Sequence, residues 1–254
     1  MSISKYLAIF GRSFLIQKQQ MANSFFKFKQ FTVWHDKCAM KVGTDGVLLG
    51  AWAAVDHAQH ILDVGAGTGL VSLMLAQRSK ALITGIEVDE LAALQAVENV
   101  EKSPWAHRIT IAHADFNRFE TTTRYDVIVS NPPYFVDSLK CPESTREKAR
   151  HNSTLTFHDL LCGVSQLLTP EGTFTVIIPT DSSDAVKQIA AQYQLTPCSE
   201  LSVITTPGAS PKRTLIAFRF GAQTCTTDTL LVELSRHVYS PQYIELTRAF
   251  YLKM

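Results

Sequence analysis

The sequence lacks the long apolar run that a membrane-spanning helix needs, because no stretch among its 254 residues approaches 18 consecutive apolar positions. It also lacks Gly/Ser tracts, Gln/Asn tracts and internal repeats. With 46% hydrophobic and 19% charged residues, the chain has enough apolar side chains to bury a core and is not of the disordered class. Its length predicts one large domain, or one domain with small additions.

A disulfide framework and a zinc knuckle are both disfavoured by the cysteine pattern. The five cysteines form no C-x-x-C pair and are odd in number; they stand at positions 38, 141, 162, 198 and 225. We therefore expect reduced thiols in a cytoplasmic protein. His57 and His60 are three residues apart but lack a helical metal motif, and no full ligand set accompanies them, so we predict no metal.

Strong net charge is missing as well, since the formal net charge is +1 at pH 7. Total charge therefore does not indicate a nucleic-acid partner, which would have to be held by a local basic patch. The apolar stretch at residues 6–10 is short and precedes Arg12 and Lys18, which disfavours a signal peptide. We divide the chain into an N-terminal extension, residues 1–27, and one domain, residues 28–254.

Short apolar segments alternate with helical patterns along most of the chain, which predicts an α/β fold with a mostly parallel sheet covered by helices on both faces. Strands are expected at 61–64, 82–87, 109–113, 126–130 and 173–178, with a strand or hairpin over 26–33 and a closing hairpin at 202–206 and 214–220. Helices are expected at 47–54, 70–78, 90–101, 160–168, 184–194 and after Ser240-Pro241. Asp45 and Asp89 are the expected N-caps of the first and third of these helices. Ligands bind beyond the carboxyl ends of parallel strands, so the loops after strands are the informative ones.

The loop after the first of these strands has the pattern D-x-G-x-G-x-G at residues 63–69. Glycines allow a sharp turn and a close approach of the backbone to a ligand. A dinucleotide loop, G-x-G-x-x-G, has its third glycine five residues after the first, a position that Leu70 occupies here. The third glycine is instead Gly69, and the loop resembles the cofactor loop of Rossmann-like methyltransferases. A dinucleotide loop and a tight turn without a ligand stay open as alternatives.

Two carboxylates follow later strands. Glu87 ends the second strand, 22 residues after Gly65, where a carboxylate accepts hydrogen bonds from the ribose hydroxyls of either cofactor class. Asp115 comes just after the third strand, and a turn-forming aspartate is the alternative interpretation of that position.

The segment S-N-P-P-Y-F at residues 130–135 follows the fourth strand, and its two successive prolines build a stiff loop. An adenine amino group is a poor nucleophile because its lone pair is delocalised into the ring. The side-chain oxygen of Asn131 and the carbonyl of Pro132 can accept its two N–H groups and aim the lone pair at a methyl donor. Tyr134 offers a face for the base, and such stacking contributes about 1–3 kcal/mol. The loop therefore predicts methyl transfer to an amino nitrogen, driven mainly by positioning.

D-x-G-x-G-T-G and N-P-P-Y together resemble the amino-methylating branch of the class I methyltransferases, from about residue 28 onward. More narrowly, several segments resemble the bacterial tRNA adenine-N6 methyltransferases that modify the anticodon loop of valine tRNA. These segments are residues 40–50, 131–135, 138–140, 149–151 and 246–254.

That resemblance implies a Rossmann-like, mostly parallel seven-stranded sheet with an antiparallel last strand. It also implies S-adenosylmethionine as the cofactor, methylation of the N6 amino group of a tRNA adenine, a cytoplasmic location and no obligate protein partner. Amino methylation of rRNA or DNA, and N5 methylation of a protein glutamine, stay open as alternatives. Only about 60 residues precede the glycine loop, which disfavours the separate helical domain typical of the glutamine enzymes.

The site residues follow from the motifs and the resemblance together. Asn131, Pro132 and Tyr134 are the expected catalytic residues. Cofactor binding is expected of Lys41, Thr44, Asp45, Asp63, Gly65, Gly67, Gly69, Glu87, Asp115 and Asn131. In the resembled family, the segment at 40–46 closes over the methionine part of the cofactor and the position of Asp115 contacts its adenine. A helix-capping turn is the alternative for the segment at 40–46.

A basic segment after the catalytic loop is the expected substrate surface, where phosphate contacts guide an RNA loop. Its expected substrate-binding residues are Phe135, Lys140, Arg146, Lys148, Arg150 and His151. Glu143 and Glu147 interrupt the positive charge, and an ordinary solvated surface is the alternative. An anticodon-loop adenine suits such a site because exposing an unpaired base costs less than flipping a paired one.

Overall fold

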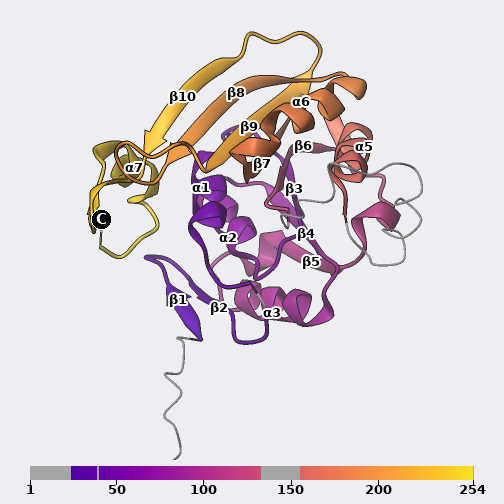
Figure 1. Ribbon diagram of the computed structural model, residues 1–254. Helices are drawn as coiled ribbons and strands as arrows, with labels where there is room; N and C mark the ends of the chain where they lie inside the picture. The colour runs from indigo at the N-terminus through magenta and orange to yellow at the C-terminus, as the bar shows by residue number, and fades with distance from the viewer. Residues whose placement is uncertain (1–23, 39, 133–154, 254) are drawn as a thin grey trace, which may run out of the picture.

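A twisted eight-stranded sheet forms the centre of the computed structural model, which describes residues 24–38, 40–132 and 155–253. The strand order is β10-β8-β9-β7-β6-β3-β4-β5 (Figure 1). The strands are β3 (His60–Val64), β4 (Leu82–Glu87), β5 (Ile109–His113), β6 (Tyr125–Ser130), β7 (Leu168–Pro179), β8 (Leu195–Ile204), β9 (Arg213–Phe220) and β10 (Thr226–Leu231). Strand β9 pairs antiparallel with β7 and β8, whereas the other pairings in this sheet are parallel.

The predicted mostly parallel sheet with an antiparallel last strand is confirmed in β3 to β9. Strand β10 is an eighth strand that the sequence analysis did not predict, and it lies parallel to β8 at the edge of the sheet. Its segment T-T-D-T-L-L is exposed over its first four residues. An edge strand of this kind carries no apolar alternation, which is why the pattern missed it.

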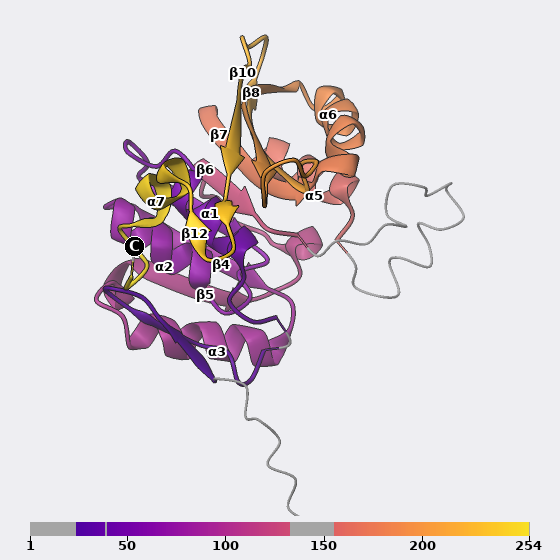
Figure 2. The same cartoon turned by 60° about the vertical axis from the view of Figure 1, so that its left-hand side comes forward.

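Helices cover both faces of the sheet (Figure 2). Side chains of β3 alternate between the faces, with Ile61 in the core beneath α1 and α2 and Leu62 in the core beneath α5 and α6. The helices are α1 (Thr44–Trp52), α2 (Leu70–Arg78), α3 (Glu90–Glu101), α5 (Phe157–Leu167), α6 (Ser183–Gln192) and α7 (Pro241–Thr247). The described residues also form the one-turn helices η1 (Ala106–Arg108), η2 (Phe116–Arg118) and η4 (Thr180–Ser182), which lie between α3 and β5, β5 and β6, and β7 and α6.

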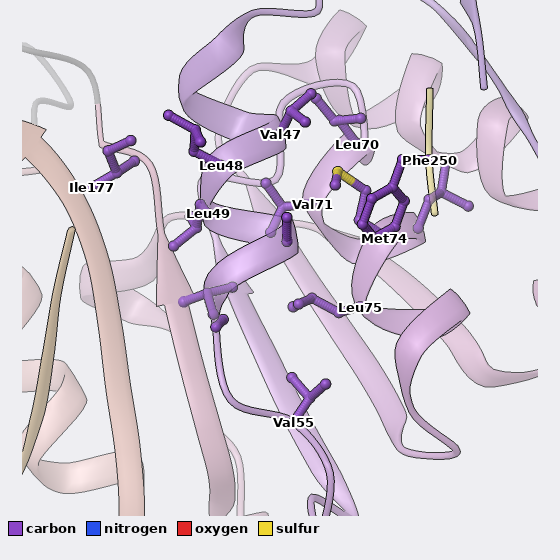
Figure 3. Close-up of a cluster of buried hydrophobic side chains, with 14 of the residues drawn as sticks. Val47, Leu48, Leu49, Val55, Leu70, Val71, Met74, Leu75, Ile177 and Phe250 are labelled. Carbon is purple, nitrogen blue, oxygen red and sulfur yellow. The ribbon is translucent and has the colours of Figure 1, made fainter. Parts of the chain in front are cut away.

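Helices α1 and α2 lie very close together because two glycines face two large side chains. A Cβ added to Gly46 would lie 3.0 Å from Cδ2 of Leu70, and one added to Gly50 would lie 2.8 Å from Cβ of Met74. The neighbouring apolar residues fill the remaining space, with Phe250 of the C-terminal segment against Met74 (Figure 3). The close approach brings the start of α1 next to the start of α2, where the glycine loop ends.

An N-terminal hairpin packs against the C-terminal segment. Strand β1 (Phe25–Lys27) pairs antiparallel with β2 (Thr32–Trp34), so of the strand or hairpin that the alternating pattern predicted, the hairpin is present. The amide of Lys29 donates to the carbonyl of Phe250 at 2.8 Å. A second small hairpin, β11 (Glu233–Ser235) and β12 (Val238–Tyr239), precedes α7.

The helix caps test three local predictions. Asp89 accepts a hydrogen bond from the amide of Ala92 and caps α3, and Ser240 caps α7, so both predictions are confirmed. The predicted N-cap at Asp45 is wrong. Helix α1 begins earlier, at Thr44, with Gly43 as its N-cap and Asp45 in its first turn. The carboxylate of Asp45 is instead bound to Arg213, 168 residues away in the sequence.

Candidate active site

The glycine loop joins β3 to α2 at the carboxyl end of the sheet. The amides of Gly65 and Ala66 both donate to the carbonyl of Ile86 at 2.9 Å, which ties the loop to β4. Gly65, Gly67 and Gly69 have φ values of 76°, 55° and 79°, a left-handed region that favours glycine. The pattern of three glycines is therefore required by the backbone path of this loop.

The three glycines differ in what surrounds them. A Cβ added to Gly65 or Gly67 would meet nothing within 4 Å, whereas one added to Gly69 would lie 3.3 Å from Cβ of Ala96 in α3. The first two glycines therefore border open space in which a ligand can reach the backbone. The third lets α2 pack closely against α3.

Glu87 links the glycine loop to the start of α3. One carboxylate oxygen accepts from the amide of Gly67 at 2.7 Å, and the other accepts from the amide of Asp89 at 2.9 Å. The side chain is 9% exposed. Each carboxylate oxygen has a second lone pair, so Glu87 can hold the loop and still accept from hydroxyl groups of a ligand. Its role as a ribose contact stays a prediction.

Asp63 precedes the glycine loop and is bonded to the helix that follows it. It is 1% exposed and accepts hydrogen bonds from the amide of Ser72 at 3.0 Å and from its hydroxyl at 2.7 Å. Burial raises the pKa of this carboxyl group to about 6, and the bonds from Ser72 lower it only in part. The carboxylate is thus bound to the first turn of α2, and its predicted part in cofactor binding stays a prediction.

Asp115 lies two residues beyond β5, next to the strand that ends in Glu87. The register pairs Glu87 with His113, and the amide of Ala114 donates to the carbonyl of Glu87 at 2.9 Å. The carboxylate of Asp115 accepts from the amide of Asn117 at 2.9 Å and so forms the turn that starts η2. The turn-forming role is therefore present, and a contact with a cofactor adenine stays a prediction.

The segment at residues 40–46, which is predicted to close over the cofactor, lies beside the glycine loop. Lys41 is exposed, and Thr44 and Asp45 form the first turn of α1. The carboxylate of Asp45 is 2.8 Å from Nε of Arg213 at the start of β9, which fixes the direction of the first turn. The close packing of α1 on α2 brings this turn near the glycine loop.

Asn131 follows β6, the strand that pairs with β3. The register pairs Val64 with Ser130, and the hydroxyl of Ser130 donates to the carbonyl of Val64 at 2.9 Å. Neighbouring strands lie about 4.8 Å apart. Gly65 and Asn131, the first residues after β3 and β6, therefore lie side by side. Asn131 is half-buried and Pro132 is buried. The glycine loop and the predicted catalytic loop therefore start next to each other, at the carboxyl ends of β3 and β6.

The fold and this arrangement agree with comparisons to known proteins. A family model described as Methyltransferase small domain matches residues 41–193, which is more than half of the chain. A tRNA1(Val) (adenine(37)-N6)-methyltransferase from Bacteroides fragilis is 60% identical over 237 residues, covering 92% of this chain and 100% of the relative. This chain belongs to the tRNA1(Val) (adenine(37)-N6)-methyltransferase family.

Solved methyltransferase structures share the fold at much lower identity. A predicted O-methyltransferase from Agrobacterium tumefaciens is 21% identical with a TM-score of 0.65, covering 81% of this chain and 96% of the other. A glycopeptide N-methyltransferase in complex with (S)-adenosyl-L-methionine is 13% identical with a TM-score of 0.52, covering 72% and 90%. At these identities the likeness concerns the fold alone.

Several residues predicted for the site of this methyltransferase lie outside the residues that the structure describes. They are Tyr134, Phe135, Lys140, Arg146, Lys148, Arg150 and His151. Their assigned roles, in stacking and in binding the substrate, stay predictions.

Sequence reasoning missed one residue that contacts the glycine loop of this methyltransferase. Asn99 in α3 is 1% exposed, and its side-chain amide donates to the carbonyl of Thr68 at 2.9 Å. A signal was present, because Gln95 and Asn99 are four residues apart on the face of α3 that carries Ala92 and Ala96. Polar residues on the apolar face of a helix indicate buried hydrogen bonds.

Two further properties concern the described part of the methyltransferase only. Among residues 24–38, 40–132 and 155–253, no helix has the length and apolar character needed to cross a membrane. Within the same ranges, no group of three or more His, Cys, Asp or Glu side chains is arranged to hold a metal ion.

Proposed function

We propose that this protein transfers a methyl group from S-adenosylmethionine to the exocyclic N6 amino group of adenine 37 in valine tRNA. The observation that carries the proposal is the pairing of Val64 with Ser130, which starts the glycine loop and the N-P-P-Y segment at neighbouring positions. The name of the Bacteroides fragilis relative, which is 60% identical, supports the choice of tRNA, base and position. A tRNA substrate also supports a cytoplasmic location.

The described residues fit S-adenosylmethionine. Open space lies next to the backbone at Gly65 and Gly67, where a Cβ would meet nothing within 4 Å, so a ligand can approach the loop closely. Glu87 presents a carboxylate at the edge of that space for the ribose hydroxyls, and the amides at the start of α2 suit polar groups of the ligand. When bound, S-adenosylmethionine supplies an electrophilic methyl group on a sulfonium ion.

Asn131 and Pro132 orient the nucleophile in this proposal. The side-chain oxygen of Asn131 and the carbonyl oxygen of Pro132 each accept one N–H of the adenine amino group. Both bonds favour a more tetrahedral nitrogen, whose lone pair then points at the methyl carbon. Fixing the two reacting atoms in this geometry contributes up to roughly 7–11 kcal/mol of barrier lowering.

No strong base is needed before transfer. The N6 nitrogen forms a bond to the methyl carbon while the bond from that carbon to sulfur breaks, and the nitrogen then carries one extra proton. That proton leaves to water after transfer and restores the neutral amine. In this proposal Tyr134 stacks on the base and excludes water from the reacting groups.

Nucleoside analysis of tRNA tests the proposal. We expect total tRNA from cells without the gene to lack N6-methyladenosine in valine tRNA, and expression of the protein to restore it. Purified protein should methylate an unmodified valine tRNA transcript and leave unmethylated a transcript with guanosine at position 37. Methylation of the guanosine transcript, or of rRNA, DNA or a protein glutamine in place of the tRNA, would overturn the assignment.

A further inference from the structure

Asn99 joins the N-terminal hairpin to the glycine loop through three hydrogen bonds. Its side-chain oxygen accepts from the amide of Trp34 at 2.8 Å, and its side-chain nitrogen donates to the carbonyls of Trp34 at 2.8 Å and of Thr68 at 2.9 Å. The amide of Trp34 requires an acceptor, which fixes the orientation of the asparagine amide. Every donor hydrogen of this buried side chain therefore has a partner.

The bond to Thr68 acts on the end of the loop that leads into α2. The carbonyl of Thr68 and the amide of Gly69 belong to one planar peptide group. That amide donates to the carbonyl of Ala66 at 2.8 Å, so the peptide is held at both ends, by Asn99 and by Ala66. This peptide lies between Gly67 and Gly69, so its two hydrogen bonds fix the path of the loop between them.

The same face of α3 holds the chain that leads to α1. Gln95, one turn before Asn99, accepts from the amide of Lys37 at 3.1 Å, and Lys37 also pairs with Glu98. The Cys38 thiol lies close enough to Glu87 and Asp89 that both carboxylates help to raise its pKa, after burial as the main cause. The segment after the hairpin therefore runs beside Glu87, toward the first turn of α1.

We infer that Asn99 is a positioning residue that holds the glycine loop in its ligand-binding shape and makes the N-terminal hairpin part of the cofactor site. The inference rests on the proposed function, since it concerns the affinity for S-adenosylmethionine. Asn99 acts through the loop and does not touch the reacting atoms. Its removal should therefore weaken cofactor binding and leave the rate at saturating cofactor almost unchanged.

Two variants at this position test the inference. Asn99→Asp keeps the shape and the acceptor for Trp34 but places an oxygen opposite the two carbonyls, and Asn99→Ser removes both donor bonds without adding charge. We expect the Kd for S-adenosylmethionine, measured by calorimetry, to rise by about tenfold or more in both variants. The KM for the cofactor should rise in parallel, while kcat stays within about twofold.

A matched control separates positioning from general destabilisation. Val186→Ala weakens the buried core at α6, on the face of the sheet opposite to α3. This control should lose thermal stability and keep the wild-type Kd. A wild-type Kd in Asn99→Ser would overturn the inference while the proposed function stands. Failure of the wild-type protein to bind S-adenosylmethionine would overturn both.

Discussion

The substitution Gly67→Ala is expected to have two effects, a loss of stability from backbone strain and a loss of affinity for the ligand. The new Cβ would meet no atom within 4 Å, so the folded protein suffers no clash. Its φ of 55° is left-handed, and an alanine in that region costs roughly 1–2 kcal/mol. In a chain of 254 residues each kcal/mol lowers the melting temperature by about 2–4 °C, so we expect a decrease of roughly 2–8 °C.

Gly221→Ala is the matched control. Gly221 also has a left-handed φ, 75°, and also has nothing within 4 Å of an added Cβ. It follows β9, and its amide donates to the carbonyl of Gln194, just before β8. Because β8 runs parallel to β3, the start of β8 lies at the amino end of the strands, whereas the glycine loop lies at their carboxyl end. The strain is therefore similar and the ligand site is remote.

Thermal melting and calorimetry with S-adenosylmethionine measure the two effects. We expect the melting temperature to fall by a similar amount in both variants. The Kd for S-adenosylmethionine should rise tenfold or more in Gly67→Ala alone, because its Cβ occupies the space that the ligand needs. Equal affinities in the two variants would refute the assignment of the glycine loop as the cofactor site.

Two further predictions concern buried contacts. Burial raises the pKa of Asp63 from its ordinary value near 3.8 to about 6, so the folded protein binds a proton that the unfolded chain releases between these values. The contribution of Asp63 to the free energy of unfolding is therefore largest below about pH 4 and falls as the pH rises to about 6. Urea unfolding of Asp63→Asn at several pH values should lack this decrease. Unfolding free energies that change with pH by the same amount in both proteins would contradict the prediction. Gly50→Ala places a Cβ 2.8 Å from both Cβ and Sδ of Met74 and should cost about 1–3 kcal/mol of unfolding free energy. Met74→Ala removes the sulfur but keeps Cβ, so the free-energy losses of the two substitutions in urea unfolding should sum to more than the loss in the double variant.

The sequence was most informative where local patterns and backbone requirements coincide. The glycines at 65, 67 and 69 have the left-handed φ values that a sharp turn requires, and β3 and β6 are short apolar runs of parallel-sheet type. Since parallel strands end at one edge of the sheet, the order of the elements already placed the glycine loop near Asn131. The register then added which residues are neighbours.

Tertiary contacts account for what the sequence did not predict. The pairing of Asp45 with Arg213 joins positions 168 residues apart, and the N-cap prediction failed because Asp45 had a distant partner. Strand β10 has mostly exposed polar residues and is held by the backbone of β8, which no local pattern encodes. Asn99 lies on a helix whose periodicity was clear, but its partners, Trp34 and Thr68, come from two other elements.

The central claim is that Asn131 orients the amino group for transfer. Asn131→Ala, compared with Asn131→Asp, tests it in a single-turnover assay with unmodified valine tRNA, alongside calorimetry with S-adenosylmethionine. We predict that Asn131→Ala lowers the transfer rate by at least about a hundredfold and leaves the cofactor Kd nearly unchanged, while Asn131→Asp, which keeps an acceptor oxygen, retains more activity. A wild-type transfer rate in Asn131→Ala would contradict the account.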